Sequence, residues 1–85
     1  MAFKKSVSTD TKINYEVIEN YGSLSTNGEW VTELRFVSWN GREPKYDIRA
    51  WKATETGEMC GKGITLTGEE MENLLNILKQ METEN

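Results

Sequence analysis

Hydrophobic and polar residues alternate along residues 30–52, a pattern typical of β-strands that are buried on one side. The alternation is interrupted by Asn40 and Gly41, and Pro44 follows them. Asn-Gly is the strongest short signal for a β-hairpin, and proline cannot donate a hydrogen bond within a sheet. The sequence therefore predicts two antiparallel strands joined by a turn over residues 40–44.

The two faces of this hairpin differ, because successive side chains of a strand point to opposite sides. One face is apolar and is expected to cover a core; it carries Leu34, Phe36, Tyr46, Ile48 and Ala50. The other face sets cations among tryptophans; it carries Arg35, Trp39, Lys45, Arg49 and Trp51. Rings among cations suit an unpaired nucleic-acid strand, whose bases stack on aromatic side chains and whose phosphates pair with the cations.

Two more strands are predicted around the hairpin. Residues 14–25 favour extended structure, with a bulge or bend at Gly22 and a turn over residues 25–28. Residues 53–61 are predicted to be a loop, and residues 62–66 a short strand. Glycines flank Lys62 in this strand, which allows either a bulge or the close approach of a ligand.

A helix is predicted over residues 68–81. Thr67 and Glu70 fit a capping box at its start. The apolar residues recur at helical spacing, at Met71, Leu74, Leu75, Leu78 and Met81. This stripe is broader than one small sheet requires, so we expect part of it to contact a second subunit.

The chain is short, with 85 residues, and reads as one domain. Residues 1–12 are polar and aperiodic and are predicted to be a flexible N-terminal arm, which leaves residues 13–85 as the domain. A core of this size is small, so oligomerisation is an expected source of stability. No run approaches the roughly 20 apolar residues of a membrane span, and we expect no membrane association.

Composition argues against catalysis. The chain has no histidine and one cysteine, which excludes histidine-based triads, a disulfide within the chain and cysteine-based metal clusters. There is no glycine-rich phosphate loop and no paired-carboxylate motif. We therefore expect neither an enzyme nor a cofactor, and we expect a cytoplasmic location, which could include association with the nucleoid.

Net charge is −4, which weighs mildly against nucleic-acid binding, but the charges are unevenly distributed. Residues 30–62 hold six Lys/Arg against five Asp/Glu, and residues 63–85 hold one against five. The acidic excess therefore falls on the predicted helix rather than on the hairpin.

Four segments, in order, carry a resemblance to a known family. They are residues 33–39 (Glu-Leu-Arg-Phe-Val-Ser-Trp), residues 47–51 (Asp-Ile-Arg-Ala-Trp), residues 57–59 (Gly-Glu-Met) and residues 62–66 (Lys-Gly-Ile-Thr-Leu), with a helix after them. Together they resemble the single-stranded-DNA-binding domain of the positive cofactor four family of transcriptional coactivators. The run over residues 40–49 is similar to its bacterial branch.

The resemblance implies an α+β fold, in which a curved four-stranded antiparallel sheet is followed by one C-terminal helix. It also implies a homodimer whose concave sheets bind single-stranded DNA with little sequence preference. The basic positions of the family match Arg35, Arg49 and Lys62, and Lys45 corresponds across a turn of different length.

The sequence also departs from the family pattern. Trp39 stands in for an aromatic residue of the family's turn, Trp51 replaces a tyrosine, Lys52 replaces a tryptophan and Glu33 replaces a lysine. The serine-rich regulatory tail of the eukaryotic members is absent, so a eukaryotic coactivator role is not carried over.

Our prediction is a homodimer that binds single-stranded DNA and serves transcription, replication or repair, with transcription or repair proteins as further partners. The predicted binding residues are Arg35, Trp39, Arg42, Lys45, Arg49, Trp51, Lys52 and Lys62. Alternatives stay open: the tryptophans could simply pack on each other, and Arg35, Arg49 and Lys45 could pair with Glu33, Asp47 and Glu43. The same face could instead bind a protein partner or single-stranded RNA.

Overall fold

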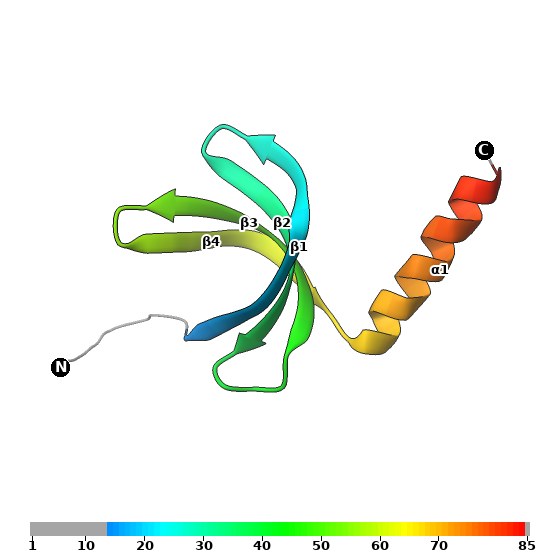
Figure 1. The fold of residues 1–85 in the computed structure, drawn as a ribbon, viewed down its shortest axis with the longest axis horizontal. Coiled ribbons are helices and arrows are strands. Elements are labelled where there is room, and N and C mark those ends of the chain that lie inside the picture. Colours follow the sequence, from blue (N-terminus) through cyan, green and yellow to red (C-terminus); the bar gives the residue numbers. More distant parts are fainter. Residues whose placement is uncertain (1–13, 85) are drawn as a thin grey trace.

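A computed structural model describes residues 14–84; the predicted N-terminal arm, residues 1–12, lies outside this range. The elements follow the order β1 (Tyr15–Asn27), β2 (Trp30–Trp39), β3 (Lys45–Thr54), β4 (Gly57–Leu66) and α1 (Gly68–Glu84). The strands form one antiparallel sheet in the order β1-β2-β3-β4, and α1 follows it (Figure 1). The predicted α+β fold, a four-stranded antiparallel sheet followed by one C-terminal helix, is confirmed.

The turn between β2 and β3 forms as its sequence predicts. Asn40 and Gly41 both adopt the left-handed conformation, with φ of 55° and 73°. The amide of Arg42 donates to the carbonyl of Trp39 at 3.0 Å. This is the type I′ geometry that Asn-Gly favours. The strand pairing resumes beyond it, with Val37 opposite Lys45 and Leu34 opposite Ile48.

The fourth strand is longer than predicted. The expected loop over residues 53–61 is wrong, because β3 continues to Thr54 and β4 begins at Gly57, so only Glu55 and Thr56 connect them. Thr54 pairs with Gly57, whose φ of 146° suits glycine. The pairing register between β3 and β4 shifts between Arg49 and Trp51, which marks a bulge in β4. The glycines of this segment therefore belong to a turn and a bulged strand.

The sheet is strongly curled toward the face that carries the tryptophans. Trp51 pairs with Val31, at the opposite end of β2 from Trp39, and eight residues of flat strand would span about 26 Å. Yet the Trp39 and Trp51 ring centroids are 6.3 Å apart. The register shifts in β1, one of them at the predicted position next to Gly22, accompany this curvature. The face that carries Trp39 and Trp51 is therefore the concave one.

Burial is concentrated on the concave face, which corrects our expectation that the apolar face covers the core. Val37 and Asp47 are fully buried, and Trp51 is 3% exposed. The residues of the opposite, convex face are only partly buried, and Ile64 there is exposed. Curvature explains the difference, because it crowds side chains together on the inner side of a sheet and spreads them on the outer side.

Helix α1 begins with the predicted capping box. The amide of Thr67 donates to Glu70 Oε1 at 2.8 Å, and the amide of Glu70 donates to Thr67 Oγ1 at 3.0 Å. The helix runs to Glu84, slightly past the predicted end, and stands beside the sheet rather than flat against it (Figure 1). No helix in residues 14–84 is long and apolar enough to cross a membrane.

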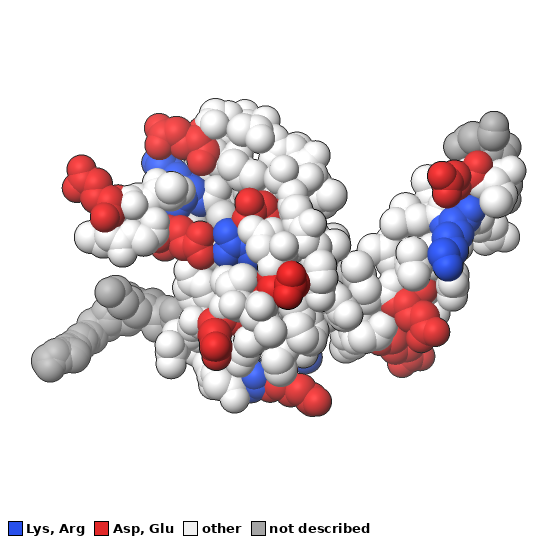
Figure 2. Space-filling model, in the orientation of Figure 1, with Lys and Arg blue, Asp and Glu red and all other residues white. Residues whose placement is uncertain are grey.

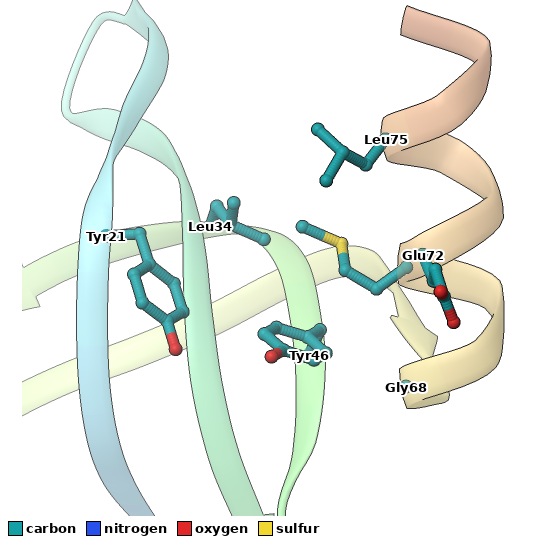
Figure 3. Close-up of a pocket in the computed structure, with 7 residues that line it drawn as sticks. Tyr21, Leu34, Tyr46, Gly68, Glu72 and Leu75 are labelled. Atoms are coloured by element: carbon teal, nitrogen blue, oxygen red, sulfur yellow. The ribbon is translucent and has the colours of Figure 1, made fainter. Parts of the chain in front are cut away.

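A groove of about 500 Å³ separates α1 from the convex face. Tyr21, Leu34 and Tyr46 line it from the sheet, and Leu75 points toward them from the helix (Figure 3). The apolar residues further along α1, including Leu78 and Met81, are exposed. The helix therefore leaves much of its apolar face, and of the sheet's, uncovered within one chain.

Candidate nucleic-acid interface

Three aromatic rings on the concave face form a cluster. The Tyr15 ring lies 5.4 Å from both the Trp39 and the Trp51 ring, and the two indoles are nearly parallel, with planes 9° apart. The Nε1 atoms of both indoles are buried without a hydrogen-bond partner. Stacking and burial therefore hold this cluster, and Trp51 forms its floor.

Both concave-face arginines lie over indole rings. The Arg35 guanidinium carbon is 3.9 Å from the centroid of the Trp51 ring, and that of Arg49 is 5.0 Å from the Trp39 ring. These are cation–π distances, and they fix the guanidinium groups close to the rings. The predicted grouping of Arg35, Trp39, Arg49 and Trp51 on one face is therefore correct.

Arg35 is held by two carboxylates. Its Nε donates to Glu33 Oε1 at 2.8 Å, and its Nη1 and Nη2 donate to Glu58 Oε2 and Oε1 at 2.9 and 3.2 Å. Tyr15 donates its hydroxyl proton to the same Glu58 Oε2 at 2.9 Å. Arg35 is buried, so this network lies largely beneath the surface.

The protonation equilibria of this network follow from its contacts. The bonds from Arg35 hold the pKa of Glu58 below its usual value, despite the opposing effect of burial. Burial and the bond to Glu58 raise the pKa of Tyr15 to about 12. At neutral pH, Glu58 is therefore an anion and Tyr15 a neutral donor.

Arg49 makes the second ion pair, with the fully buried Asp47. Its Nε and Nη2 donate to Asp47 oxygens at 3.0 to 3.3 Å, and its Nη1 donates to the carbonyl of Gly61 at 3.1 Å. Gly63 lies opposite Arg49, and a Cβ there would be 2.5 Å from the Ile48 carbonyl oxygen and 2.6 Å from Arg49 Cβ. Glycine is therefore the residue that this packing accommodates.

Trp39 is the ring of the cluster beside open space. One hollow of about 270 Å³ is lined by Trp39, Arg49, Cys60 and Thr65, together with Asn40. A second, of about 250 Å³, is lined by Trp39, Arg42, Glu43, Lys45 and Thr65. Trp39 and Thr65 line both hollows. The cations Arg42, Lys45 and Arg49 therefore lie around one indole, that of Trp39.

The predicted site residues thus fall into three groups. Trp39, Arg42, Lys45 and Arg49 line the hollows, whereas Arg35 and Trp51 are buried beneath them. Lys52 lies opposite Trp30 in the register and pairs with Glu29 at 3.6 Å, away from the cluster. Lys62 is exposed in the irregular part of β4.

Two residues of the site were missed in the sequence. Tyr15 lies in a strand whose two faces are both partly apolar, so alternation could not assign its side. Glu58 fell in the segment predicted to be a loop.

Charge on the visible surface is mixed, with Lys/Arg beside Asp/Glu on the sheet (Figure 2). Among residues 14–84, no cluster of three or more potential metal-binding side chains occurs.

A sequence model of the transcriptional coactivator p15 (PC4) family matches residues 27–77. The chain belongs to this family. It is also 49% identical over 69 residues to an uncharacterized protein of Treponema pallidum (strain Nichols), a match that covers 80% of this chain and 79% of that protein. The resemblance inferred from the four segments is thereby confirmed.

The PC4 match extends from the last residue of β1 into α1. It contains every predicted binding residue, together with Glu58. Tyr15 lies outside the match, although its ring completes the aromatic cluster. The PC4 domain of this chain therefore uses β1 to close one side of its concave face.

Proposed function

We propose that this protein binds single-stranded DNA through the two hollows around Trp39 on the concave face, with little sequence preference. Membership in the PC4 family, whose domains bind nucleic acid and are not enzymes, supports the class of ligand. The observation that carries the proposal is the pair of hollows that meet at the Trp39 indole and are bordered by Arg42, Lys45 and Arg49.

In the proposed mechanism, a base stacks on Trp39 and the adjacent phosphates contact the bordering cations. Base stacking on an aromatic side chain contributes about 1–3 kcal/mol and tolerates any sequence, because every base has a π-face. Arg49 is held by Asp47 at its inner edge and lies over the indole. Trp51 and Arg35 support the surface from below.

We further propose that two copies form a homodimer through α1 and the convex face. The radius of gyration is 15.6 Å, whereas a compact domain of this size has roughly 11–12 Å. Ile64, Leu75 and Leu78 are exposed in the single chain. Pairing would bury this surface and leave both concave faces available to DNA, in the cytoplasm or at the nucleoid.

The direct test is a competition assay. A labelled oligothymidine complex is challenged with unlabelled single-stranded DNA, duplex DNA and single-stranded RNA at two salt concentrations. The proposal expects single-stranded DNA to compete best, and affinity to fall with salt at a log–log slope of about −0.7 per phosphate neutralised. Equal competition by RNA would favour an RNA ligand, and no complex with any strand would favour the protein-interaction alternative.

A further inference from the structure

The ion pairs of Arg49 and Arg35 on the concave face differ in which partner, the acid or the cation, is more exposed. At Arg49 the acid is inside: the Asp47 side chain is fully buried and the Arg49 side chain is 18% exposed. At Arg35 the acid is outside: the Arg35 side chain is 9% exposed, and those of Glu33 and Glu58 are 19% and 29% exposed. An approaching phosphate therefore meets a cation at Arg49 and carboxylates at Arg35.

All three nitrogens of the Arg35 guanidinium donate to carboxylates. Glu58 takes both terminal nitrogens, Glu33 takes Nε, and one side of the guanidinium lies over Trp51. With one positive and two negative groups, this part of the face carries a net charge of −1. Asn20 and Tyr15 donate to Glu33 and Glu58, which keeps both carboxylates in place.

We propose that Glu58 is a specificity-determining residue that competes with phosphate for Arg35. The inference rests on the proposed function. Binding to duplex DNA without sequence preference depends almost entirely on phosphate contacts. A single strand also offers bases, which can stack on Trp39. A duplex carries one phosphate charge per about 1.7 Å of its axis, twice the density of one of its strands, so a carboxylate that masks one cation and repels phosphate weakens duplex binding more than single-strand binding.

The test compares Glu58→Gln with Glu55→Gln. Glutamine keeps the shape of Glu58 and an oxygen to accept from Tyr15 and Arg35, but it removes the charge. Glu55 is an exposed residue of the β3–β4 turn and makes no hydrogen bond or ion pair with any residue in the range 14–84, so its variant controls for net charge. Affinities for an oligothymidine and for a duplex of equal length are measured against salt.

For Glu58→Gln we expect duplex affinity to rise about tenfold, which corresponds to about 1.4 kcal/mol. Single-strand affinity should rise less, and the duplex salt slope should steepen, because Glu58 no longer neutralises the charge of Arg35. Should Glu58→Gln fail to fold, Glu33→Gln tests whether a carboxylate at Arg35 lowers duplex affinity, and parental discrimination between the two ligands in that variant would overturn the inference.

The inference is overturned if the parent binds single strands and Glu58→Gln behaves like Glu55→Gln toward both ligands. It is also overturned if the two affinities rise by the same factor, since Glu58 would then not discriminate between them. If the parent binds neither ligand, the proposed function fails, and this inference fails with it.

Discussion

Trp39 and Trp51 stack with their ring planes 9° apart, although one lies at the end of β2 and the other pairs near its beginning. This contact requires the sheet to curl, and the curl gives the two indoles different environments. Trp51 becomes a buried floor, whereas Trp39 borders both hollows of the concave face. The two residues can therefore be separated by experiment.

Truncation of Trp51 should mainly affect stability. Replacing a buried tryptophan with alanine removes its packing and leaves a cavity, so Trp51→Ala should lower the free energy of unfolding by about 3–5 kcal/mol. Trp39→Ala should cost less, because Trp39 is only partly buried. Urea unfolding followed by circular dichroism measures both, and equal losses would contradict the assignment of Trp51 to the core.

Replacing Gly63 should destabilise the fold because a side chain would collide with neighbouring atoms, and not because of the backbone conformation of Gly63. A Cβ at this position would lie 2.5 Å from the Ile48 carbonyl oxygen, so the backbone beside Arg49 would have to shift. Gly63→Ala should destabilise the chain by about 1–3 kcal/mol. Gly68→Ala is the control, since nothing lies within 4 Å of a Cβ there. Similar unfolding curves for the two variants would show that β3 and β4 are not packed this tightly.

Alkaline pH should weaken the fold through Tyr15. Its pKa rises from the ordinary tyrosine value of 10.0 to about 12 in the folded chain, so the neutral form is favoured by folding. The stabilisation is complete below pH 10 and is lost as the pH rises toward 12. Tyrosinate absorbance should show a last titration step near pH 12 that Tyr15→Phe removes. A complete titration of the parent near pH 10 would argue against the bond to Glu58.

The homodimer prediction can be tested on the helix. Leu78 is exposed on the apolar stripe of α1, and a charge there should disrupt a subunit contact. Sedimentation should therefore give a dimer for the parent and a monomer for Leu78→Glu. Gln80→Glu adds the same charge off the stripe and should stay dimeric. A monomeric parent at micromolar concentration would refute the dimer.

The sequence predicted what depends on local chemistry. Alternation was enough to place Trp39 and Arg49 on one face, and Asn40-Gly41 was enough to specify the turn, because strand parity and turn geometry are local properties. Curvature is not local. The sequence therefore did not reveal that Trp51 and Arg35 would be buried, or that Glu58 would reach a residue in β2.

Salt dependence should show which cations bordering the hollows contact phosphate. Arg49→Ala should weaken oligothymidine binding and reduce the magnitude of the log–log salt slope by about 0.7, since one phosphate contact is lost. Lys79→Ala removes a positive charge from α1 and should leave the slope unchanged. If both variants lower affinity with the same slope, only net charge matters and Arg49 does not contact phosphate.

Trp39 carries the proposed binding mechanism, and the oligothymidine affinity of Trp39→Ala tests that role most directly. Trp30→Ala is the matched control, because Trp30 packs near Gly61 and Ala50, away from the aromatic cluster. We predict that Trp39→Ala binds about 5- to 150-fold more weakly than the parent, the equivalent of about 1–3 kcal/mol of stacking, with an unchanged salt slope, and that Trp30→Ala binds like the parent. Parental affinity in a folded Trp39→Ala variant would contradict the central claim.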